Sequence, residues 1–143
     1  MKATLPLPEF AARQARALLT NLVRQIERTL DKPDADAIHD LRVAVRRFSQ
    51  CLDVFQDLFP RGSARRVRRR VNRLRKSAGM ARDCDIALEY LAKDRVPDSR
   101  SFARELRDVR KQAYRELLAV LERVRRKQSW QKWRSRLGIG DAL

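Results

Sequence analysis

The segment HDLRVAVRRF (His39–Phe48) decides the fold, because two kinds of side chain follow one another in it with a helical period. Its apolar residues recur every three or four positions and continue to Phe59, which predicts a helix that buries one face. His39, Arg42 and Arg46 fall within roughly 60° of one another on the helical wheel, away from the apolar stripe. The sequence therefore predicts a packed helix whose other face presents a histidine and a row of cations.

Apolar stripes of the same kind predict further helices on both sides of this segment. We expect helices at residues 8–31, from Asp34 or Asp36 as the cap to Phe59, and from Ser63 onward after a turn at residues 60–63. Gly79 marks either a break in the third helix or a close contact between backbones, after which a helix covers residues 83–92. The predicted core stripe of the third helix is Val67, Val71, Leu74 and Ala78.

The rest of the chain predicts two more helices. After a connection at residues 96–99, Ser101 is placed to cap a long helix that reaches about residue 124. Trp130, Trp133 and Leu137 predict a short amphipathic segment, followed by a tail at residues 138–143. We therefore expect an all-α fold, an antiparallel four-helix bundle with a short extra C-terminal helix, in one domain whose core covers about residues 8–137.

The net charge is too high for an ordinary protein surface. The chain has 34 Lys and Arg against 18 Asp and Glu, a formal net charge of +16 over 143 residues. Self-repulsion at this level opposes compaction, so the expected partner is a polyanion: nucleic acid, polyphosphate or an anionic membrane. Arginine outnumbers lysine, and its planar guanidinium suits bidentate contacts with phosphate.

The sequence indicates neither an enzyme nor a metal centre. It has one histidine, no carboxylate pair beside a base and no glycine-rich phosphate loop, so we expect a non-catalytic protein without a cofactor. Cys51 and Cys84 lack metal-ligand spacing, and we expect both to be reduced residues in or near the core. No signal peptide and no membrane-spanning segment are predicted, which favours a cytoplasmic protein that does not insert into a membrane.

A second basic row follows the turn at residues 60–63. Like charges at i and i+4 destabilise a helix by roughly 0.2–0.5 kcal/mol per pair, and no Asp or Glu is interleaved between Arg61 and Lys76. Anion binding is therefore favoured over a solvated helix face, which is the alternative. In the later helix the charges are mixed, but Arg110, at the edge of the apolar stripe, could extend its guanidinium into an anion site. The second row is Arg65, Arg69, Arg73 and Lys76.

His39 has three interpretations. It can donate a hydrogen bond to a phosphate oxygen, and this is the interpretation that we favour, because Arg42 and Arg46 lie on the same helix face. It can accept a phosphoryl group, as in histidine phosphotransfer proteins, which are also four-helix bundles, although Val43 and the charge of +16 suit their partner surfaces poorly. It can also be a structural cap or a surface residue.

Aromatic residues distinguish between the polyanions. Phe, Tyr and Trp make up 6% of the chain, and Phe48, Phe55 and Phe59 lie on the predicted core stripe. Single-stranded nucleic-acid binders place stacking residues among their cations. A ligand of phosphates without bases is therefore favoured, while binding to the backbone of a duplex stays open.

The segment His39–Phe48 resembles the signature of the CHAD family, the conserved-histidine α-helical domains. That signature is approximately H-x-x-R-V-x-x-R-R-hydrophobic, and its matching residues are His39, Arg42, Val43, Arg46, Arg47 and Phe48. A second family motif, roughly L-x-x-x-x-G-x-x-R-D-x-D-hydrophobic, is matched by Leu74, Gly79, Arg82, Asp83, Asp85 and Ile86, with Ala78 in place of the usual leucine. The resemblance runs from about residue 10 to the mid-nineties, and more loosely beyond residue 101.

The resemblance implies that the protein binds inorganic polyphosphate in a basic channel without catalysis, and that it is found with polyphosphate granules. The alternatives are a protein that binds the phosphate backbone of nucleic acid and, third, a histidine phosphotransfer module. The candidate polyphosphate ligands are His39, Arg42, Arg46, Arg47, Arg65, Arg69, Arg73, Lys76 and Arg110.

Family members are typically about twice as long, with two related bundles around the channel, and this chain resembles one half. It acts either as an open basic groove or, as we favour, as a homodimer in which two copies rebuild the channel. Trp130 and Trp133 are candidates for an apolar seam, or ordinary core residues. The segment Arg82–Asp85 is expected to form a buried ion pair and a helix cap rather than to contact phosphate.

Overall fold

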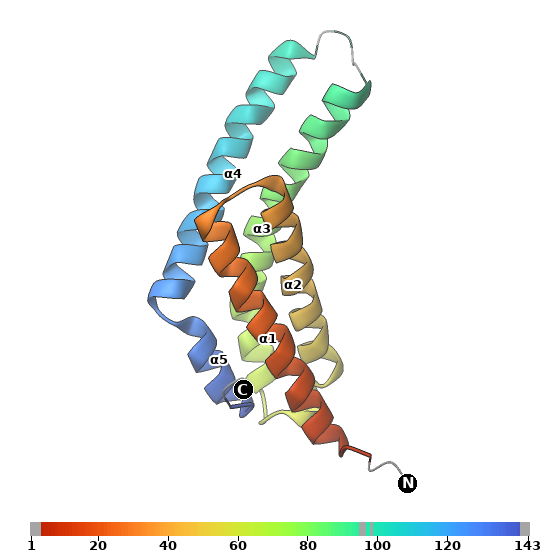
Figure 1. Ribbon diagram of the computed structural model, residues 1–143, viewed down its shortest axis with the longest axis vertical. Helices are drawn as coiled ribbons and strands as arrows, with labels where there is room; N and C mark the ends of the chain where they lie inside the picture. Colours follow the sequence, from red (N-terminus) through yellow and green to blue (C-terminus); the bar gives the residue numbers. More distant parts are fainter. Residues whose placement is uncertain (1–3, 95–96, 98, 141–143) are drawn as a thin grey trace.

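The computed structural model describes residues 4–94, 97 and 99–140, and within these residues it contains helices and loops but no strand. Figure 1 shows the arrangement of the helices. They are α1 (Leu7–Asp31), α2 (Ala35–Val54), the 3-10 helix η1 (Gln56–Leu58), α3 (Ser63–Asp94), α4 (Arg100–Arg126) and α5 (Ser129–Leu137). The predicted all-α class, with four long helices and a short C-terminal one, is confirmed.

Successive helices pack against one another. The principal contacts join α1 with α2, α2 with α3 and α3 with α4, and α5 packs against α1, α3 and α4. α3 and α4 extend past the loop between α1 and α2 as a projecting hairpin, at the top of Figure 1. The bundle is therefore closed by α5 at one end, while at the other end two helices continue without α1 and α2.

One hydrophobic cluster holds the bundle together. Each large apolar side chain in it contributes about 1.5–3 kcal/mol relative to an exposed one. Val109 of α4, whose three- and four-residue spacing to Leu106 and Ala113 predicts a place in the core, is instead half exposed. The stripe predicted for α3 and most of the stripe predicted for α2 are fully buried: Val67, Val71, Leu74, Ala78, Leu41, Val45, Phe48 and Leu52.

The predicted start of α2 is confirmed, and its predicted end is wrong. The carboxylate of Asp34 accepts a hydrogen bond from the backbone N–H of Ala37 at 2.8 Å, so Asp34 is the cap. The helix ends at Val54 rather than at Phe59. Phe59 is extended, with φ −101° and ψ 163°, because the ring of Pro60 disfavours a helical conformation in the residue before it.

The predicted break at Gly79 is absent. α3 is one helix of 32 residues, and a Cβ atom built on Gly79 would meet nothing within 4 Å, so no backbone approaches closely either. A glycine inside a helix costs about 1 kcal/mol relative to alanine, which the packing of α3 against both α2 and α4 outweighs. Asp83 and Asp85 consequently lie inside α3 and cap no new helix.

The buried ion pair expected at Arg82–Asp85 exists, but its basic partner comes from α4. Asp85 is 5% exposed, and its Oδ1 accepts a hydrogen bond from Nε of Arg110 at 2.7 Å. Its Oδ2 accepts a hydrogen bond from the hydroxyl of Tyr114 at 2.6 Å. Arg82 instead lies 4.0 Å from the carboxylate of Glu89. The second family motif therefore ties α3 to α4 through Asp85.

This pairing corrects the role expected for Arg110. Its guanidinium carbon lies 4.1 Å from the centre of the Tyr114 ring, and its Nη2 donates a hydrogen bond to the Tyr114 hydroxyl at 2.9 Å. With Nε bound to Asp85 as well, the guanidinium is held inside the α3–α4 contact. Arg110 does not extend from a packed stem into an anion site.

The C-terminal part also differs in detail. α4 begins at Arg100, so Ser101 is no cap, and residues 96 and 98 of the predicted connection lie outside the described residues. Trp133 is buried and Trp130 packs partly buried against the same core, which makes them core residues rather than a seam. The predicted tail is wrong at Ile139, which is 1% exposed and whose carbonyl accepts a hydrogen bond from Nε of Arg16 at 2.8 Å. Residues 141–143 of that tail lie outside the description.

The two cysteines agree with the prediction. Cys51 and Cys84 are buried free thiols, and burial raises the pKa of both. In the described ranges, no helix combines the length and the apolar character needed to span a membrane.

Replacing Tyr114 by phenylalanine tests the tie between α3 and α4. The change removes one of the two hydrogen bonds to a buried carboxylate, so we expect a loss of about 1–3 kcal/mol in the free energy of unfolding. Urea denaturation followed by circular dichroism measures it. Tyr90→Phe is the matched control, because Tyr90 is exposed. Equal stability of Tyr114→Phe and Tyr90→Phe would contradict the assignment.

The same network predicts a dependence on pH. Burial and the hydrogen bond to Asp85 raise the pKa of Tyr114. The unfolded chain therefore ionises first, and the wild-type protein loses this contribution to stability as the pH rises above about 10, the ordinary phenol pKa. The Tyr114→Phe variant has no phenol to ionise at this position, so its free energy of unfolding should fall less than that of the wild type above this pH.

Candidate polyanion-binding surface

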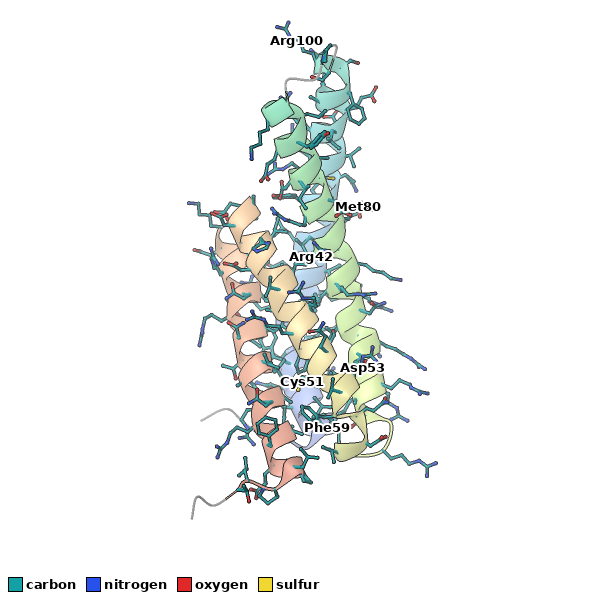
Figure 2. All side chains as sticks on the ribbon, turned by 90° about the vertical axis from the view of Figure 1, so that its right-hand side faces the viewer. Arg42, Cys51, Asp53, Phe59, Met80 and Arg100 are labelled. Atoms are coloured by element: carbon teal, nitrogen blue, oxygen red, sulfur yellow. The ribbon has the colours of Figure 1, made fainter. Side chains whose placement is uncertain are left out.

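The ion pair between Arg68 and Asp53 indicates the approximate register of α2 and α3. Nη1 of Arg68 donates a hydrogen bond to Oδ1 of Asp53 at 3.0 Å. Because antiparallel helices have the same rise of about 1.5 Å per residue, each step back along α2 matches one step forward along α3. Arg46 is therefore level with Arg75. Asp53 and Arg42 are labelled on α2 in Figure 2.

The same register continues along the predicted histidine row. Arg42 is level with Gly79, and His39 is level with Arg82, both from the second family motif. His39, Arg42 and Arg46 are exposed, and Gly79 offers no side chain opposite Arg42. We name the surface formed by His39, Arg42, Arg46, Arg75 and Arg82 the α2–α3 basic face.

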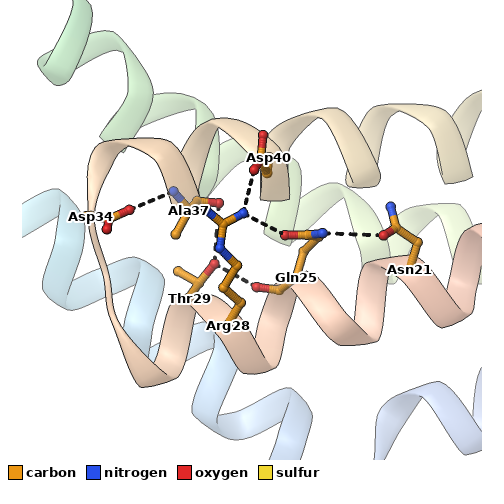
Figure 3. A network of polar contacts seen from close by, with 7 residues as sticks. All are labelled: Asn21, Gln25, Arg28, Thr29, Asp34, Ala37 and Asp40. Atoms are coloured by element: carbon orange, nitrogen blue, oxygen red, sulfur yellow. Dashed lines mark hydrogen bonds and ion pairs between the residues drawn. The ribbon is translucent and has the colours of Figure 1, made fainter.

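The carboxylate that adjoins His39 in the sequence is drawn away from this face. Figure 3 shows Asp40 bound by Arg28 of α1, which also donates a hydrogen bond to Gln25 at 3.4 Å. Arg47 lies seven residues after Asp40 and thus on the same flank of α2. Helical spacing therefore puts Arg47 on the flank toward α1, and Arg42 and Arg46 on the flank of Asp53, toward α3.

The row predicted on α3 does not form one straight line. Four residues turn a helix by about 400°, so each i to i+4 step moves the side chain about 40° around the axis. Arg65 and Arg69 line a shallow pocket beside Ser49 of α2. Arg73 lines a different pocket toward α4 and α5, and Arg69 and Arg73 together line a further hollow with Arg66, Arg70 and Arg136. Lys76 is exposed and lines none of these pockets.

Three arginines of α3 face α2 but are not among the ligands predicted from the sequence. Arg68, Arg75 and Arg82 recur every seven residues on the side of α3 that faces α2, a spacing that also marks one helix face. Arg82 belongs to the second family motif, for which the sequence predicts an ion pair and a helix cap rather than a phosphate contact. Nε of Arg75 donates a hydrogen bond to Oδ1 of Asn72 at 3.0 Å, which orients it without neutralising its charge.

The cations of the predicted site are without acidic partners. Among the described residues, no ion pair involves the predicted ligands other than Arg110. These eight are His39, Arg42, Arg46, Arg47, Arg65, Arg69, Arg73 and Lys76. No group of three or more His, Cys, Asp or Glu that could hold a metal ion occurs in that part of the chain. The surface therefore offers hydrogen-bond donors and positive charge, the groups that bind phosphate.

Comparison with known proteins identifies the family. No curated protein and no solved structure matches the chain. A family model described as CHAD domain matches residues 13–142, which include both motifs and extend through α4 and α5. The chain therefore belongs to the CHAD domain family.

Proposed function

We propose that this protein binds inorganic polyphosphate along the α2–α3 basic face and that it does so without catalysis. Membership of the CHAD family, which is associated with polyphosphate binding, supports the ligand. The observation that carries the proposal is the ion pair between Arg68 and Asp53, from which the helical rise puts Arg46 level with Arg75, His39 level with Arg82, and Gly79 with its open space opposite Arg42.

The chemistry of this face suits a linear chain of phosphates. Residues three or four apart on a helix are separated by about 4.5–6 Å along its axis, so the cations present charge at short, regular intervals. Each guanidinium can donate two parallel hydrogen bonds to one phosphate group, and bound chain displaces counterions from the protein and the ligand. His39 at the end of the row would donate a further hydrogen bond.

The composition of this face favours phosphate over nucleotide bases. The shallow pocket between α2 and α3 is lined by arginines, Ser49 and Asn72, and no aromatic residue takes part. Binding of single strands relies on stacking of bases on aromatic rings, which contributes about 1–3 kcal/mol per base. Arg65 and Arg69 in this pocket extend the proposed site along α3, whereas Arg110 is left out because Asp85 holds it.

We further propose that two copies associate through the projecting α3–α4 hairpin. Tyr90 and Phe102 on this hairpin are 64% and 56% exposed. Between Asp83 and Arg110 the sequence has seven Asp and Glu against six Lys and Arg, whereas the whole chain carries +16. The hairpin is thus the part of the molecule where two copies can meet with little repulsion and bury apolar surface. In the cell such a protein would lie where polyphosphate accumulates, in cytoplasmic granules.

Replacing Arg42 and Arg46 together by alanine tests the site. We expect affinity for long-chain polyphosphate to fall at least about tenfold, because two charge-assisted contacts are lost, and the salt dependence to become less steep. Fluorescence anisotropy with labelled polyphosphate measures both. The matched control replaces Arg13 and Arg24, two exposed arginines of α1, by alanine and removes the same charge. Unchanged affinity of Arg42→Ala/Arg46→Ala, with unchanged helicity, would place the site elsewhere.

Light scattering during gel filtration tests the association. We expect a mass near twice 16.8 kDa for the wild-type protein. Tyr90→Ser with Phe102→Ser should shift it to the mass of one chain, because the apolar contact is lost. Val54→Ser is the control, since Val54 is exposed on α2, away from the hairpin. A monomeric wild-type protein with or without polyphosphate would refute the association and leave the binding site untouched.

A further inference from the structure

A second basic site lies on the side of α3 turned away from α2. A pocket of about 300 Å³ opens between α3, α4 and α5. α3 contributes Arg66, Arg70 and Arg73, which recur at helical spacing on one face. The C-terminal end of α4 contributes Arg123 and the residue that caps the helix, Lys127. None of these five residues belongs to the α2–α3 basic face.

α5 adds two further cations to the same pocket. After α4 ends, Gln128 adopts φ 48°, the one positive φ outside glycine in the described residues, and the chain changes direction into α5. A left-handed conformation costs a residue other than glycine about 1–2 kcal/mol. The turn brings Lys132 and Arg136, four residues apart on α5, to the pocket. Three helices therefore direct seven basic side chains at one small volume.

The floor of this pocket is apolar and packed. Val67 is fully buried, Trp133 is 4% exposed, and Val120 and Val124 complete the base. No carboxylate lines the pocket, and none of its basic residues forms an ion pair among the described residues. The cations are thus not needed to neutralise acidic groups, and their mutual repulsion opposes folding. A ligand with several negative charges would offset that repulsion.

We propose that this pocket binds a compact, multiply phosphorylated anion. Its volume is at the small end of ligand pockets, which span about 300–1,000 Å³, so it suits a few clustered phosphate groups rather than a long chain. This site is separate from the α2–α3 basic face, and the proposal does not depend on whether that face binds polyphosphate. Two sources share this chemistry: short inorganic polyphosphate, and a small organic molecule with clustered phosphates.

The chain carries its own reporter for this site. It has two tryptophans, Trp130 and Trp133, both on α5, and Trp133 lines the pocket. Binding of tripolyphosphate should change the tryptophan emission in a saturable manner with one molecule per chain. Sulfate at equal ionic strength should give no saturable change, because one divalent anion cannot span three helices. Inositol hexakisphosphate serves as the organic probe, and the tighter of the two phosphate ligands identifies the source.

Arg123→Ala with Lys127→Ala should weaken this response at least about tenfold, since two charge-assisted contacts are lost. Both residues are exposed, so the variant should fold, with a Tm equal to or above that of the wild type without ligand. Lys132→Gln gives a second, milder test on α5. Arg42→Ala/Arg46→Ala and Arg13→Ala/Arg24→Ala should respond as the wild type does.

The outcomes separate this site from the proposed function. A normal response in Arg123→Ala/Lys127→Ala, or no saturable response in the wild type, overturns the pocket. A response lost in Arg42→Ala/Arg46→Ala also overturns it, because the pocket would then not be a separate site. Loss of long-chain binding in Arg42→Ala/Arg46→Ala with an intact tryptophan response supports both sites independently.

Discussion

The first half of α3, residues 63–76, buries a single apolar stripe and carries positive charge on its remaining sides, and the rest of the structure is arranged around this helix. Eight of the twelve residues from Arg65 to Lys76 are basic. Neighbouring like charges cost roughly 0.2–0.5 kcal/mol per pair, whereas each of Val67, Val71 and Leu74 contributes about 1.5–3 kcal/mol when buried. The stripe therefore outweighs the repulsion, and α3 holds its cations outward toward α2 on one side and toward α4 and α5 on the other.

The two family motifs divide their residues between holding the bundle and presenting charge. Asp85 is buried and joins α3 to α4 through Arg110 and Tyr114. Arg82, three residues earlier, is partly buried, lies 4.0 Å from the Glu89 carboxylate and is level with His39 by the register of α2 and α3. Gly79 leaves the space opposite Arg42 without breaking α3. One short segment thus sets both the contact between helices and the spacing of the proposed binding face.

Local features were predictable from the sequence, and contacts between distant residues were not. The stripes of α2 and α3, the Asp34 cap and the shared face of His39, Arg42 and Arg46 follow from helical period alone. The pairing of Asp85 with Arg110 joins residues 25 apart, so no local pattern reveals it. The helix end before Pro60 could have been predicted from the restriction that proline places on Phe59.

The predicted basic row shows where helical geometry sets a further limit. Each step of four residues moves the side chain about 40° around the helix axis. Arg65 and Arg73 therefore face different neighbours, although the spacing in the sequence puts both opposite the apolar stripe. Gly79 shows the converse case, in which a residue with a poor helix propensity is held in a helix by packing on both sides.

A competition titration tests the central claim most directly. Labelled long-chain polyphosphate, bound to the wild-type protein at about 150 mM salt, is displaced by unlabelled polyphosphate or by duplex DNA at equal phosphate concentration. Binding through guanidinium rows without base contacts predicts that polyphosphate displaces the label at a clearly lower phosphate concentration than duplex DNA does. Displacement by duplex DNA at the same or a lower concentration would contradict polyphosphate as the ligand and assign the α2–α3 basic face to the nucleic-acid backbone.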